Sequence, residues 1–364
     1  MTLILSNAEI ANIVTMEECI DALEGSFIDL AKGHGAFRRR SDINTRTGYS
    51  PDGMYVLKSM DGVVPASGVA AIRINSDVIT FPKVDGSLRR VRVPAAPNNR
   101  YTGLVLLFST DTGEPLAIFP DGVIQPMRVA ATSALGAKCL AREDAADVAI
   151  LGSGWQARAQ ARAIVRVRPI KRIRCYSPNE VKRRSFAVEM SPIVGIGIEP
   201  VDAPEAAVEG AEIVLCATNS TIAVFKPPWI EKGMHLSSIQ PAELGPDVVR
   251  IVDVTATLSR DCDPVYITTH GLCVPEEPGG GIQNLAHEVE WSSLVTLPEL
   301  LVEQRCGRGA SRGRTTRDQV TCFLNPMGLG YQFAAVGAVV YRRAKERCCG
   351  RELPTDWFTE TEMP

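Results

Sequence analysis

The sequence predicts an α/β protein that combines a doubly wound parallel sheet with a second domain of mixed α/β character. Its 364 residues suffice for two domains, since a domain commonly spans about 150 residues. Strand and helix patterns alternate through the middle of the chain, which is typical of a parallel sheet with helices on both faces. The first third instead contains a strand pair closed by a tight turn, which favours an antiparallel or mixed sheet.

The first domain is expected to comprise residues 1–125 together with 320–364. Its opening helix is indicated by apolar residues that recur at intervals of three and four, and it closes at Gly33. A hairpin is indicated by two apolar runs that flank the turn sequence DTGE. The predicted elements are a helix at 16–30, strands at 104–108 and 115–119, and a final helix at 330–345 that returns to this domain.

The second domain is expected to comprise residues 126–319. Its first helix, at 127–140, is rich in small and apolar residues that suit close packing. The predicted elements that follow are strands at 147–151 and 170–176, helices at 156–165 and 180–190, and further strands at 211–217, 234–239 and 250–254. Beyond residue 255 the pattern weakens, and the run at 275–281 is expected to be a loop.

The composition excludes several classes of protein and partner. Apolar residues make up 45% and charged residues 22%, ordinary globular values that rule out a disordered chain or a coiled-coil rod. The 42 acidic and 39 basic side chains give a net charge of -3, so neither nucleic acid nor an anionic membrane is an expected partner. No secretory signal is visible, no apolar stretch is long enough for a membrane span, and the cysteines show no disulfide or zinc spacing. We therefore expect a cytoplasmic protein with reduced thiols and, because its histidines lie far apart, no metal.

A glycine-rich turn between a strand and a helix carries the clearest chemical signal. The run DVAILGSGWQA at 147–157 matches a dinucleotide-binding GxGxxG turn in which alanine takes the third position. The first glycine permits the tight turn, and the second lets the helix N–H groups approach a diphosphate. The alternative is a structural glycine turn without a nucleotide. The residues predicted to form the binding turn are Gly152, Ser153, Gly154, Trp155, Gln156 and Ala157.

The residues after the second strand favour NADP(H) over NAD(H) as the cofactor. NAD-binding domains commonly have an acidic residue there, which bonds the ribose hydroxyls and would repel a 2′-phosphate. Here the strand ends in the sequence YSPN, no carboxylate occurs before Glu180, and a basic run follows at 182–184. Ser177, Asn179 and Arg183 are therefore the candidate contacts. The alternative for the basic run is a solvated helix face.

Several stretches, in order along the chain, resemble the ornithine cyclodeaminase/mu-crystallin family. They are DTGEPLA at 111–117, DGVIQPMRVAATSALGA at 121–137, GSGWQA at 152–157, AEIVLCAT at 211–218 and GMHLSSI at 233–239. The resemblance implies a homodimer whose subunit joins a substrate-binding and dimerisation domain to a Rossmann domain, with the catalytic cleft between them. It also implies chemistry at the carbon that bears the amine of an amino or imino acid.

The resemblance places the family's site residues on matching positions. The arginine that holds the substrate carboxylate corresponds to one of Arg38, Arg39 and Arg40, of which we choose Arg40. Arg128 matches the arginine beside the carboxylate and the nicotinamide, and a guanidinium can bind a carboxylate through two parallel hydrogen bonds. Without the resemblance, the run at 38–40 is a solvated basic turn. Further predicted cofactor contacts are Thr218, Asn219 and Ile239.

Two departures from the family pattern affect the proton chemistry. Arg73 stands where the family has a lysine, and because arginine does not readily lose its proton, Lys58 becomes a candidate for that role. The alternative for Lys58 is an ordinary exposed lysine. The family's insert with a catalytic aspartate is missing after Ile239. Glu243, which follows, is either a general acid or base or a helix-terminal charge.

A third departure lies near the C-terminus, where Gln332 and Phe333 replace an acidic pair. These changes indicate a divergent branch that resembles proteins labelled as a tyramine oxidase subunit, with an apolar or aromatic substrate tail. We expect an NAD(P)-dependent oxidoreductase that acts on the C–N bond of a small amino or imino acid. One alternative is a redox-neutral, ornithine-cyclodeaminase-like ammonia lyase with retained NAD. Another is an NADPH-loaded binding protein or accessory subunit like mu-crystallin.

Overall fold

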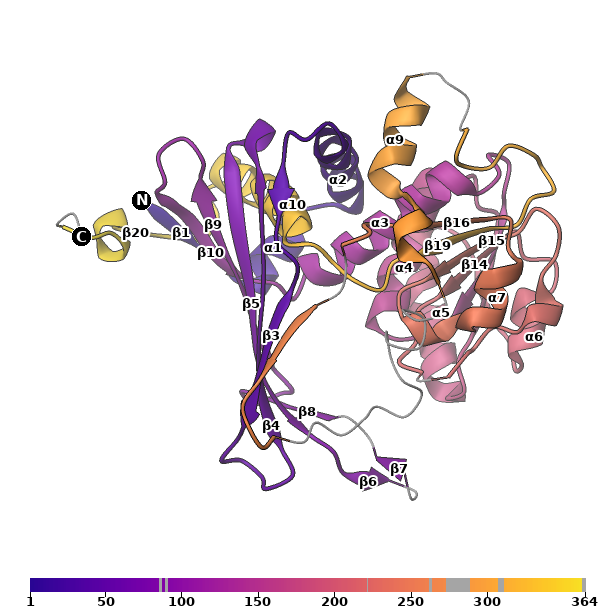
Figure 1. Ribbon diagram of the computed structural model, residues 1–364, viewed down its shortest axis with the longest axis horizontal. Coiled ribbons are helices and arrows are strands. Elements are labelled where there is room, and N and C mark those ends of the chain that lie inside the picture. Colours follow the sequence, from indigo (N-terminus) through magenta and orange to yellow (C-terminus); the bar gives the residue numbers. More distant parts are fainter. Residues whose placement is uncertain are drawn as a thin grey trace.

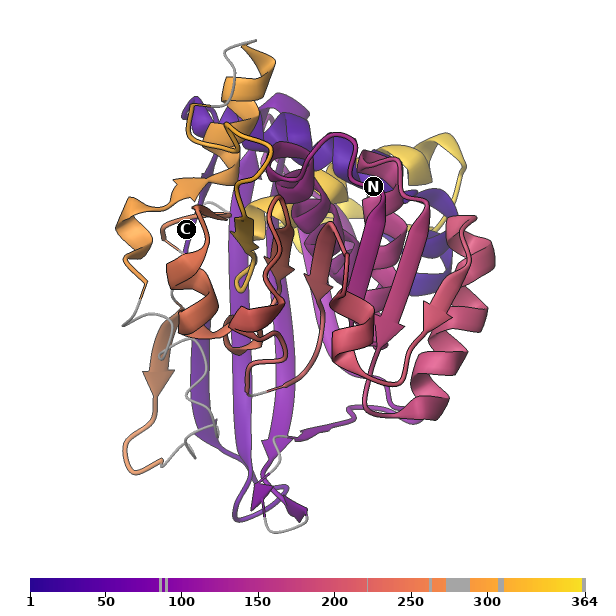
Figure 2. The ribbon, with the colours of Figure 1, turned by 90° about the vertical axis from the view of Figure 1, so that its right-hand side faces the viewer.

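The computed structural model contains two large sheets with helices packed on them (Figure 1). It describes residues 1–84, 87–88, 91–220, 222–261, 264–272, 289–306 and 311–361. Both ends of the chain contribute strands to the first sheet, and the middle of the chain forms most of the second. Figure 2 shows the second sheet in front, with the longer strands of the first sheet extending behind and beyond it.

The first sheet is mixed and contains the predicted hairpin. Its strands lie in the order β17 (Val265–Thr268), β3 (Ser41–Arg46), β4 (Met54–Val64), β5 (Val69–Thr80), β9 (Thr102–Ser109), β10 (Pro115–Pro120), β1 (Thr2–Ile4) and β20 (Arg351–Leu353). Shorter strands are β2 (Ala36–Phe37) and β8 (Val91–Val93), which pair with β4 and β5, and the separate pair β6 (Lys83–Val84) and β7 (Ser87–Leu88). β9 and β10 run antiparallel, which confirms the hairpin. Buried and partly exposed residues alternate strictly along β5, so this part of the sheet is buried on one face.

Helices cover that face of the first sheet. They are α1 (Asn7–Ile13), α2 (Met16–Ala31), α3 (Ile124–Leu140) and α10 (Gly330–Glu346). In Figure 1, α2 and α3 lie between the first sheet and the second domain, and α10 overlaps the strands of the first sheet in this view. The return of α10 to this domain is confirmed, because Phe333 and Val336 join Phe27 and Phe119 in one core. Burial of each such side chain stabilises the fold by about 1.5–3 kcal/mol.

The second sheet is parallel and has the Rossmann order. Its strands are β13 (Ile198–Pro200), β12 (Arg172–Tyr176), β11 (Asp147–Leu151), β14 (Ile213–Cys216), β15 (His235–Ser238), β19 (Thr321–Leu324), β16 (Val254–Thr257) and β18 (Val295–Thr296). Its helices are α4 (Trp155–Val167), α5 (Glu180–Val194), α6 (Pro204–Val208), α7 (Gly245–Ile251) and α9 (Leu297–Arg305). Chain order reverses at β11, as in doubly wound folds. The strands and helices predicted between residues 147 and 239 are all present.

The strand predicted at 250–254 is wrong, because the chain remains helical through Ile251. Helix α7 begins at Gly245 with Pro246 in its first turn, a favourable position for proline, and it buries Val248 and Val249. The strand β16 begins only at Val254. A short run of β-branched residues does not by itself distinguish a strand from a buried helix.

Three segments join a different domain from the one that the predicted boundaries at residues 126 and 320 assign to them. β19 pairs with β15 and β16 in the second sheet, although its residues fall in the segment assigned to the first domain. β17 instead pairs with β3 of the first sheet. Helix α9 buries Leu297, Leu300 and Leu301 in the core of the first domain. Short elements carry too little pattern to indicate which sheet they join. The loop predicted at 275–281 lies outside the described residues.

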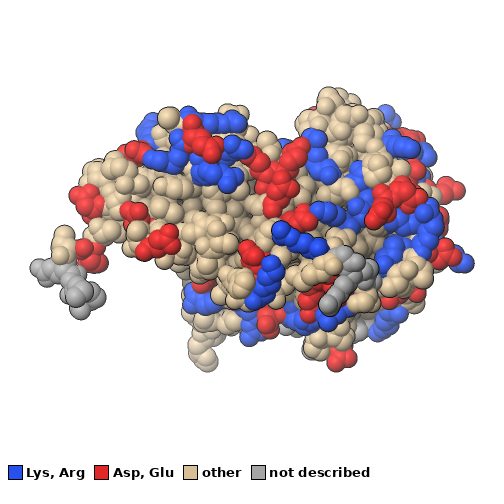
Figure 3. Space-filling model, turned by 90° about the horizontal axis from the view of Figure 1, so that it is seen from above, with Lys and Arg blue, Asp and Glu red and all other residues tan. Residues whose placement is uncertain are grey.

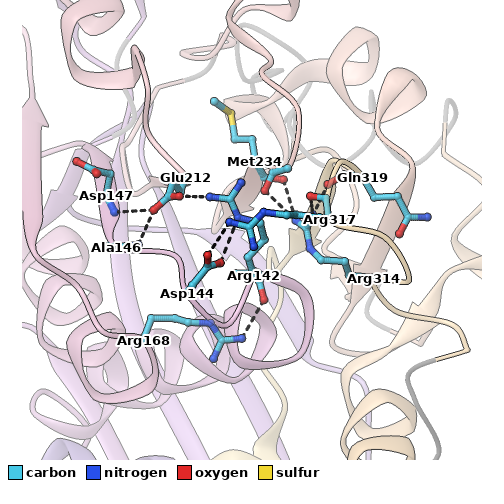
Figure 4. A network of polar contacts seen from close by, with 12 residues as sticks. Arg142, Asp144, Ala146, Asp147, Arg168, Glu212, Met234, Arg314, Arg317 and Gln319 are labelled. Carbon is cyan, nitrogen blue, oxygen red and sulfur yellow. Dashed lines mark hydrogen bonds and ion pairs between the residues drawn. The ribbon is translucent and has the colours of Figure 1, made fainter.

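Partly buried arginines stabilise the edge at which the strands of the second sheet begin (Figure 4). Arg168 donates to the carbonyl oxygens of Ala137, Lys138 and Ala141 at the C-terminal end of α3. Arg314 donates to the carbonyl oxygens of Gly233 and Met234, just before β15. Glu212 accepts from the backbone N–H groups of residues 146 and 147 at 2.6 and 3.1 Å. These contacts fix the amino ends of several strands together.

Charged side chains of both signs are interspersed over the face shown in Figure 3. A surface of mixed sign does not produce the large single-sign field that steers polyanions. Within the described residues, no helix has the length and apolar character that crossing a membrane requires.

Candidate active site

The glycine turn lies between β11 and α4, as predicted. Gly152 has a φ of 127°, a region open to glycine, and a Cβ there would collide with the carbonyl oxygen of Ala217. Its N–H donates to the carbonyl oxygen of Tyr176 at 2.8 Å. Ala157 is fully buried in the core that contains Ile150, so the helix packs closely on the strand. Gly152 and Ala157 therefore each have a local structural reason.

The rest of the turn leaves room for an anion. Among the described residues, a Cβ on Gly154 would meet nothing within 4 Å, and no side chain caps this end of α4. The first N–H groups of the helix therefore face open space at the positive end of its dipole. Ser153 is partly exposed, Trp155 is exposed, and Gln156 donates to Gln125 Oε1 at 3.1 Å. The diphosphate of a dinucleotide fits this arrangement.

Arg183 points inward from the first turn of α5, beside the loop that follows β12. Its buried side chain donates to the carbonyl oxygen of Ser177 at 3.2 Å and pairs with Asp202. Asn179 accepts from the N–H of Lys182 at 2.9 Å and so caps α5. The predicted contact of Arg183 with a 2′-phosphate would require its guanidinium to leave both partners. In this structure Arg183 holds the loop instead.

Two arginines predicted for the site lie on the covered face of the first sheet. Arg73, on β5, donates to Oδ2 of Asp121 from Nε and Nη2 at 2.8 and 2.6 Å, and its side chain is 11% exposed. Arg40 directly precedes β3 and binds both carboxylate oxygens of Asp42, at 2.8 and 3.1 Å. An aspartate thus orients each guanidinium.

Arg128 reaches the same region from helix α3 and has a neutral partner. Its Nη1 donates to Gln332 Oε1 at 3.0 Å, and its buried Nε has no hydrogen-bond partner among the described residues. The guanidinium carbons of Arg128 and Arg73 lie 5.2 and 5.3 Å from the centre of the Phe333 ring. Burial, followed by the charge of Arg73, lowers the pKa of Arg128. A bound carboxylate would offset both effects.

Lys58 lies on the same face of the first sheet, close to these arginines. On β4 it lies opposite Asp42 of β3 and Asn75 of β5. Its Nζ is 3.6 Å from Oδ2 of Asp77, and its side chain is only 16% exposed. Lys58 is therefore not an ordinary exposed lysine. Together with the arginines it forms a polar region on an otherwise apolar face.

Glu243 belongs to a different environment, at the edge of the second sheet. It is fully buried and accepts hydrogen bonds from Thr218, Ser238, Ile239 and Gln240. Burial raises the pKa of Glu243, and these donors oppose the rise. Within the described part of the chain, no hydrogen bond or ion pair joins Glu243 to the arginines of the first sheet. The structure thus groups four predicted cations and leaves the predicted acid apart, while the neighbouring Asn219 is exposed.

Sequence reasoning missed the acidic partners of these cations, which are Asp42, Asp77 and Asp121. It recognised Gln332 and Phe333 only as departures from a family pattern. A local signal exists for Asp77, because Arg73, Asn75 and Asp77 alternate on β5 with the same period as its buried apolar residues. Within the described residues, no group of three or more potential metal ligands occurs.

The parallel sheet with its glycine turn, and the separate mixed domain that carries the arginines, define a two-domain Rossmann protein. The model of the ornithine cyclodeaminase/mu-crystallin family matches residues 1–258, and the chain belongs to this family.

Individual relatives span most of the chain. It is 26% identical over 363 residues to a putative dehydrogenase of Rhizobium meliloti, covering 95% of this chain and 97% of the other. It is 27% identical over 254 residues to a Δ1-pyrroline-2-carboxylate reductase of Bacillus cereus, covering 69% and 74%. The structure of a Δ1-pyrroline-2-carboxylate reductase of Thermococcus litoralis, in complex with NADH and L-proline, matches with a TM-score of 0.76 at 24% identity. That match covers 97% of this chain and 100% of the other, and it shows the same fold.

Proposed function

We propose that the protein is a nicotinamide-dependent oxidoreductase acting on the C–N bond of a small amino or imino acid, as an amino-acid dehydrogenase or imine reductase. The observation that carries the proposal is the meeting of Arg73 and Arg128 on the ring of Phe333. Two buried cations, one bound to an aspartate and the other to a neutral glutamine, favour an anionic group on the substrate. The glycine turn supports a dinucleotide cofactor, and the similarity to pyrroline-2-carboxylate reductases supports an imino acid.

The chain's own residues supply orientation and a proton. Arg128 and Arg73 hold the substrate carboxylate, and Arg40 adds positive charge on the same side. Such positioning can lower a barrier by about 7–11 kcal/mol in favourable cases. When bound, the nicotinamide supplies or accepts the hydride at the carbon. Lys58 Nζ gives a proton to the substrate nitrogen during reduction and takes it back during oxidation.

The proton role of Lys58 is tested by Lys58→Met. Loss of a general acid should lower kcat by about 10²- to 10⁴-fold, and the KM for the carboxylate substrate should change far less. Lys83→Met is a control on β6, outside the first sheet, and should retain full activity. An unchanged kcat in Lys58→Met would exclude Lys58 as the proton donor.

We also propose a preference for NADP(H) over NAD(H). Ser177, not an acidic residue, follows β12, and Lys182 in the first turn of α5 is exposed. Lys182 can therefore take the 2′-phosphate contact that Arg183 does not offer in its present position. Fluorescence titration should give tighter binding of NADPH than of NADH, and Lys182→Glu should reduce that ratio. Tighter binding of NADH would contradict the preference and leave the proposed reaction class intact.

A homodimer is the assembly we propose. On the outer face of the first sheet, Ile74 lies opposite Leu104 and Ile72 opposite Leu106. None of these side chains joins a buried core of the described chain, and Leu104 is 39% exposed. An uncovered apolar sheet face of this kind is typical of a subunit interface.

The proposed activity is tested by incubating the protein with NADPH or NADH and a panel of cyclic imino acids, or of 2-oxo acids with amines. Consumption of the reduced coenzyme with at least one substrate is expected. Release of ammonia and proline from ornithine without added oxidant would establish a cyclodeaminase instead. Ligand-dependent changes in NADPH fluorescence with no turnover on any substrate would support a binding protein and overturn the proposal.

A further inference from the structure

The carboxylate of Glu243 joins two loops at the edge where the strands of the second sheet end. Oε1 accepts from the N–H and the hydroxyl of Thr218, at 2.5 and 2.8 Å, just after β14. Oε2 accepts from the N–H groups of Ile239 and Gln240, at 3.0 and 2.9 Å, just after β15. The hydroxyl of Ser238 adds a further bond at 3.0 Å. Because β14 and β15 are neighbours, one side chain fixes both loops.

These loops also contact the dinucleotide turn. The N–H of Ala217 donates to the carbonyl oxygen of Leu151 at 2.8 Å. The carbonyl of Ala217 lies so close to Gly152 that it excludes a Cβ there. Thr218, which donates to Glu243, is the residue that follows Ala217. Glu243 thus binds the neighbour of the residue that packs against Gly152. A shift of Thr218 would therefore be transmitted directly to Gly152.

The position of these loops determines which part of a cofactor they would face. A dinucleotide lies across the carboxyl edge of a Rossmann sheet, with one mononucleotide on each half of the fold. β11, β12 and β13 form the half that holds the glycine turn, and β14 and β15 belong to the other half. The loops held by Glu243 thus face the nicotinamide half.

We propose that Glu243 is a positioning residue that holds these loops against the nicotinamide half of the cofactor, and that it is not the general acid or base. This inference rests on the proposed function, since it requires a nicotinamide coenzyme. The carboxylate is fully buried, and its oxygens already accept from five donors. A carboxylate offers about four lone-pair sites, so its capacity is used within the protein.

The test is Glu243→Gln, which keeps the shape and replaces one acceptor oxygen with an N–H donor. That donor would face N–H or O–H groups of the loops, and a buried donor without an acceptor is costly. The Kd of NADPH, measured by fluorescence titration, should rise at least about tenfold. At saturating NADPH, kcat should stay within about threefold of wild type, and the pH profile of kcat should be unchanged.

The matched control is Glu212→Gln at the opposite edge of the same sheet (Figure 4). Glu212 also accepts backbone N–H groups, from residues 146 and 147, and pairs with Arg142. Its replacement should lower the thermal midpoint but leave the Kd of NADPH unchanged. A structural effect common to both edges would raise the Kd in both variants.

The possible outcomes separate this inference from the proposed function. If wild type binds neither NADPH nor NADH, the proposed function fails together with the inference. If wild type binds but Glu243→Gln has the same Kd, or loses kcat about a hundredfold at saturation, only the positioning role is overturned. Should Glu243→Gln not fold, Glu243→Asp gives the same readout. The side chain of this variant is one methylene shorter. It is again expected to raise the Kd of NADPH by a larger factor than that by which it lowers kcat.

Discussion

At the scale of single residues, Arg128 has the least common environment in the site. Its side chain contacts a neutral amide and an aromatic ring, whereas Arg40 and Arg73 each bind an aspartate. A buried cation in these surroundings gains more from an anionic ligand than one that is already paired. The substrate carboxylate is thus expected to bind most strongly at Arg128.

We predict that Arg128→Lys lowers kcat/KM for a carboxylate substrate by about tenfold to a hundredfold. Lysine keeps the charge but loses the paired N–H groups of the guanidinium, and a hydrogen bond to a charged group is worth about 1.5–3 kcal/mol. Steady-state kinetics with a cyclic imino acid measures the change. Arg158→Lys, at an exposed ion pair with Glu189, is the control and should change kcat/KM less than twofold. Equal losses in both variants would contradict the special role of Arg128.

The sequence could predict the arginines of the site but not what surrounds them. Arg73 and Arg128 follow from a family pattern, and the structure brings both to one ring. Asp121 lies 48 positions from Arg73 in the chain, and no local periodicity links the two. The sequence leaves two roles open for Glu243, because its donors come from loops whose folding no helix or strand pattern describes. Residues that become neighbours only in the folded chain can be identified only from the three-dimensional structure.

At the scale of elements, the turn between β11 and α4 separates structural from binding glycines. Gly152 is confined by its positive φ and by Ala217, whereas a Cβ on Gly154 would meet only open space at a φ of -84°. The first glycine therefore serves the fold. The second keeps the approach to the helix N-terminus free.

Gly154→Ala should therefore fold with a thermal midpoint close to wild type and bind NADPH at least about tenfold more weakly, because its methyl group occupies the space for the diphosphate. Gly152→Ala should lose both stability and binding, since its Cβ collides with backbone at a φ that alanine rarely adopts. Thermal unfolding and NADPH titration of both variants measure the difference. Unchanged affinity in Gly154→Ala would show that the diphosphate does not lie at this turn.

Elements with a long, clear period were predictable, and short ones were not. The alternation from β11 to β15 spans enough chain for the parallel sheet to be recognised. β19 contains only Thr321–Leu324, and its place between β15 and β16 depends on pairing with distant strands. The helical identity of 250–251 likewise follows from the burial of Val248 and Val249, which is a tertiary property.

The outer face of the first sheet makes the assembly testable. We predict that the double variant Ile74→Asp, Leu104→Asp is monomeric in light scattering when wild type is dimeric, because burying the two added charges in an interface is unfavourable. Val181→Asp is the control, since Val181 is an apolar residue on α5 that is 77% exposed. A dimer that persists in the double variant would place the interface elsewhere.

At the scale of the whole molecule, the edge opposite the cofactor turn makes stability depend on pH. His235 is fully buried at the start of β15, and its Nδ1 lies 2.9 Å from the hydroxyl of Thr321. Its Nε2 is buried without a hydrogen-bond partner in the described part of the chain. Burial, and then the charges of Arg314 and Arg168, lower the pKa of His235 to about 3. The imidazole of His235 is therefore neutral in the native state. In the unfolded chain it becomes protonated below about pH 6.5.

The unfolded state binds a proton at His235 more readily than the native state does. Between about pH 6.5 and 3 the unfolded state binds one more proton than the native state at His235, so stability falls as the pH falls, by up to about 1.4 kcal/mol per pH unit. Above that range this group contributes no slope. We predict that His235→Gln reduces the pH dependence of the urea midpoint between about pH 5 and 6.5, whatever its effect on absolute stability at higher pH. Equal slopes in the two proteins would mean that His235 is protonated in the native state, and the arginine-lined edge would then need a water or an anion to accommodate the charge.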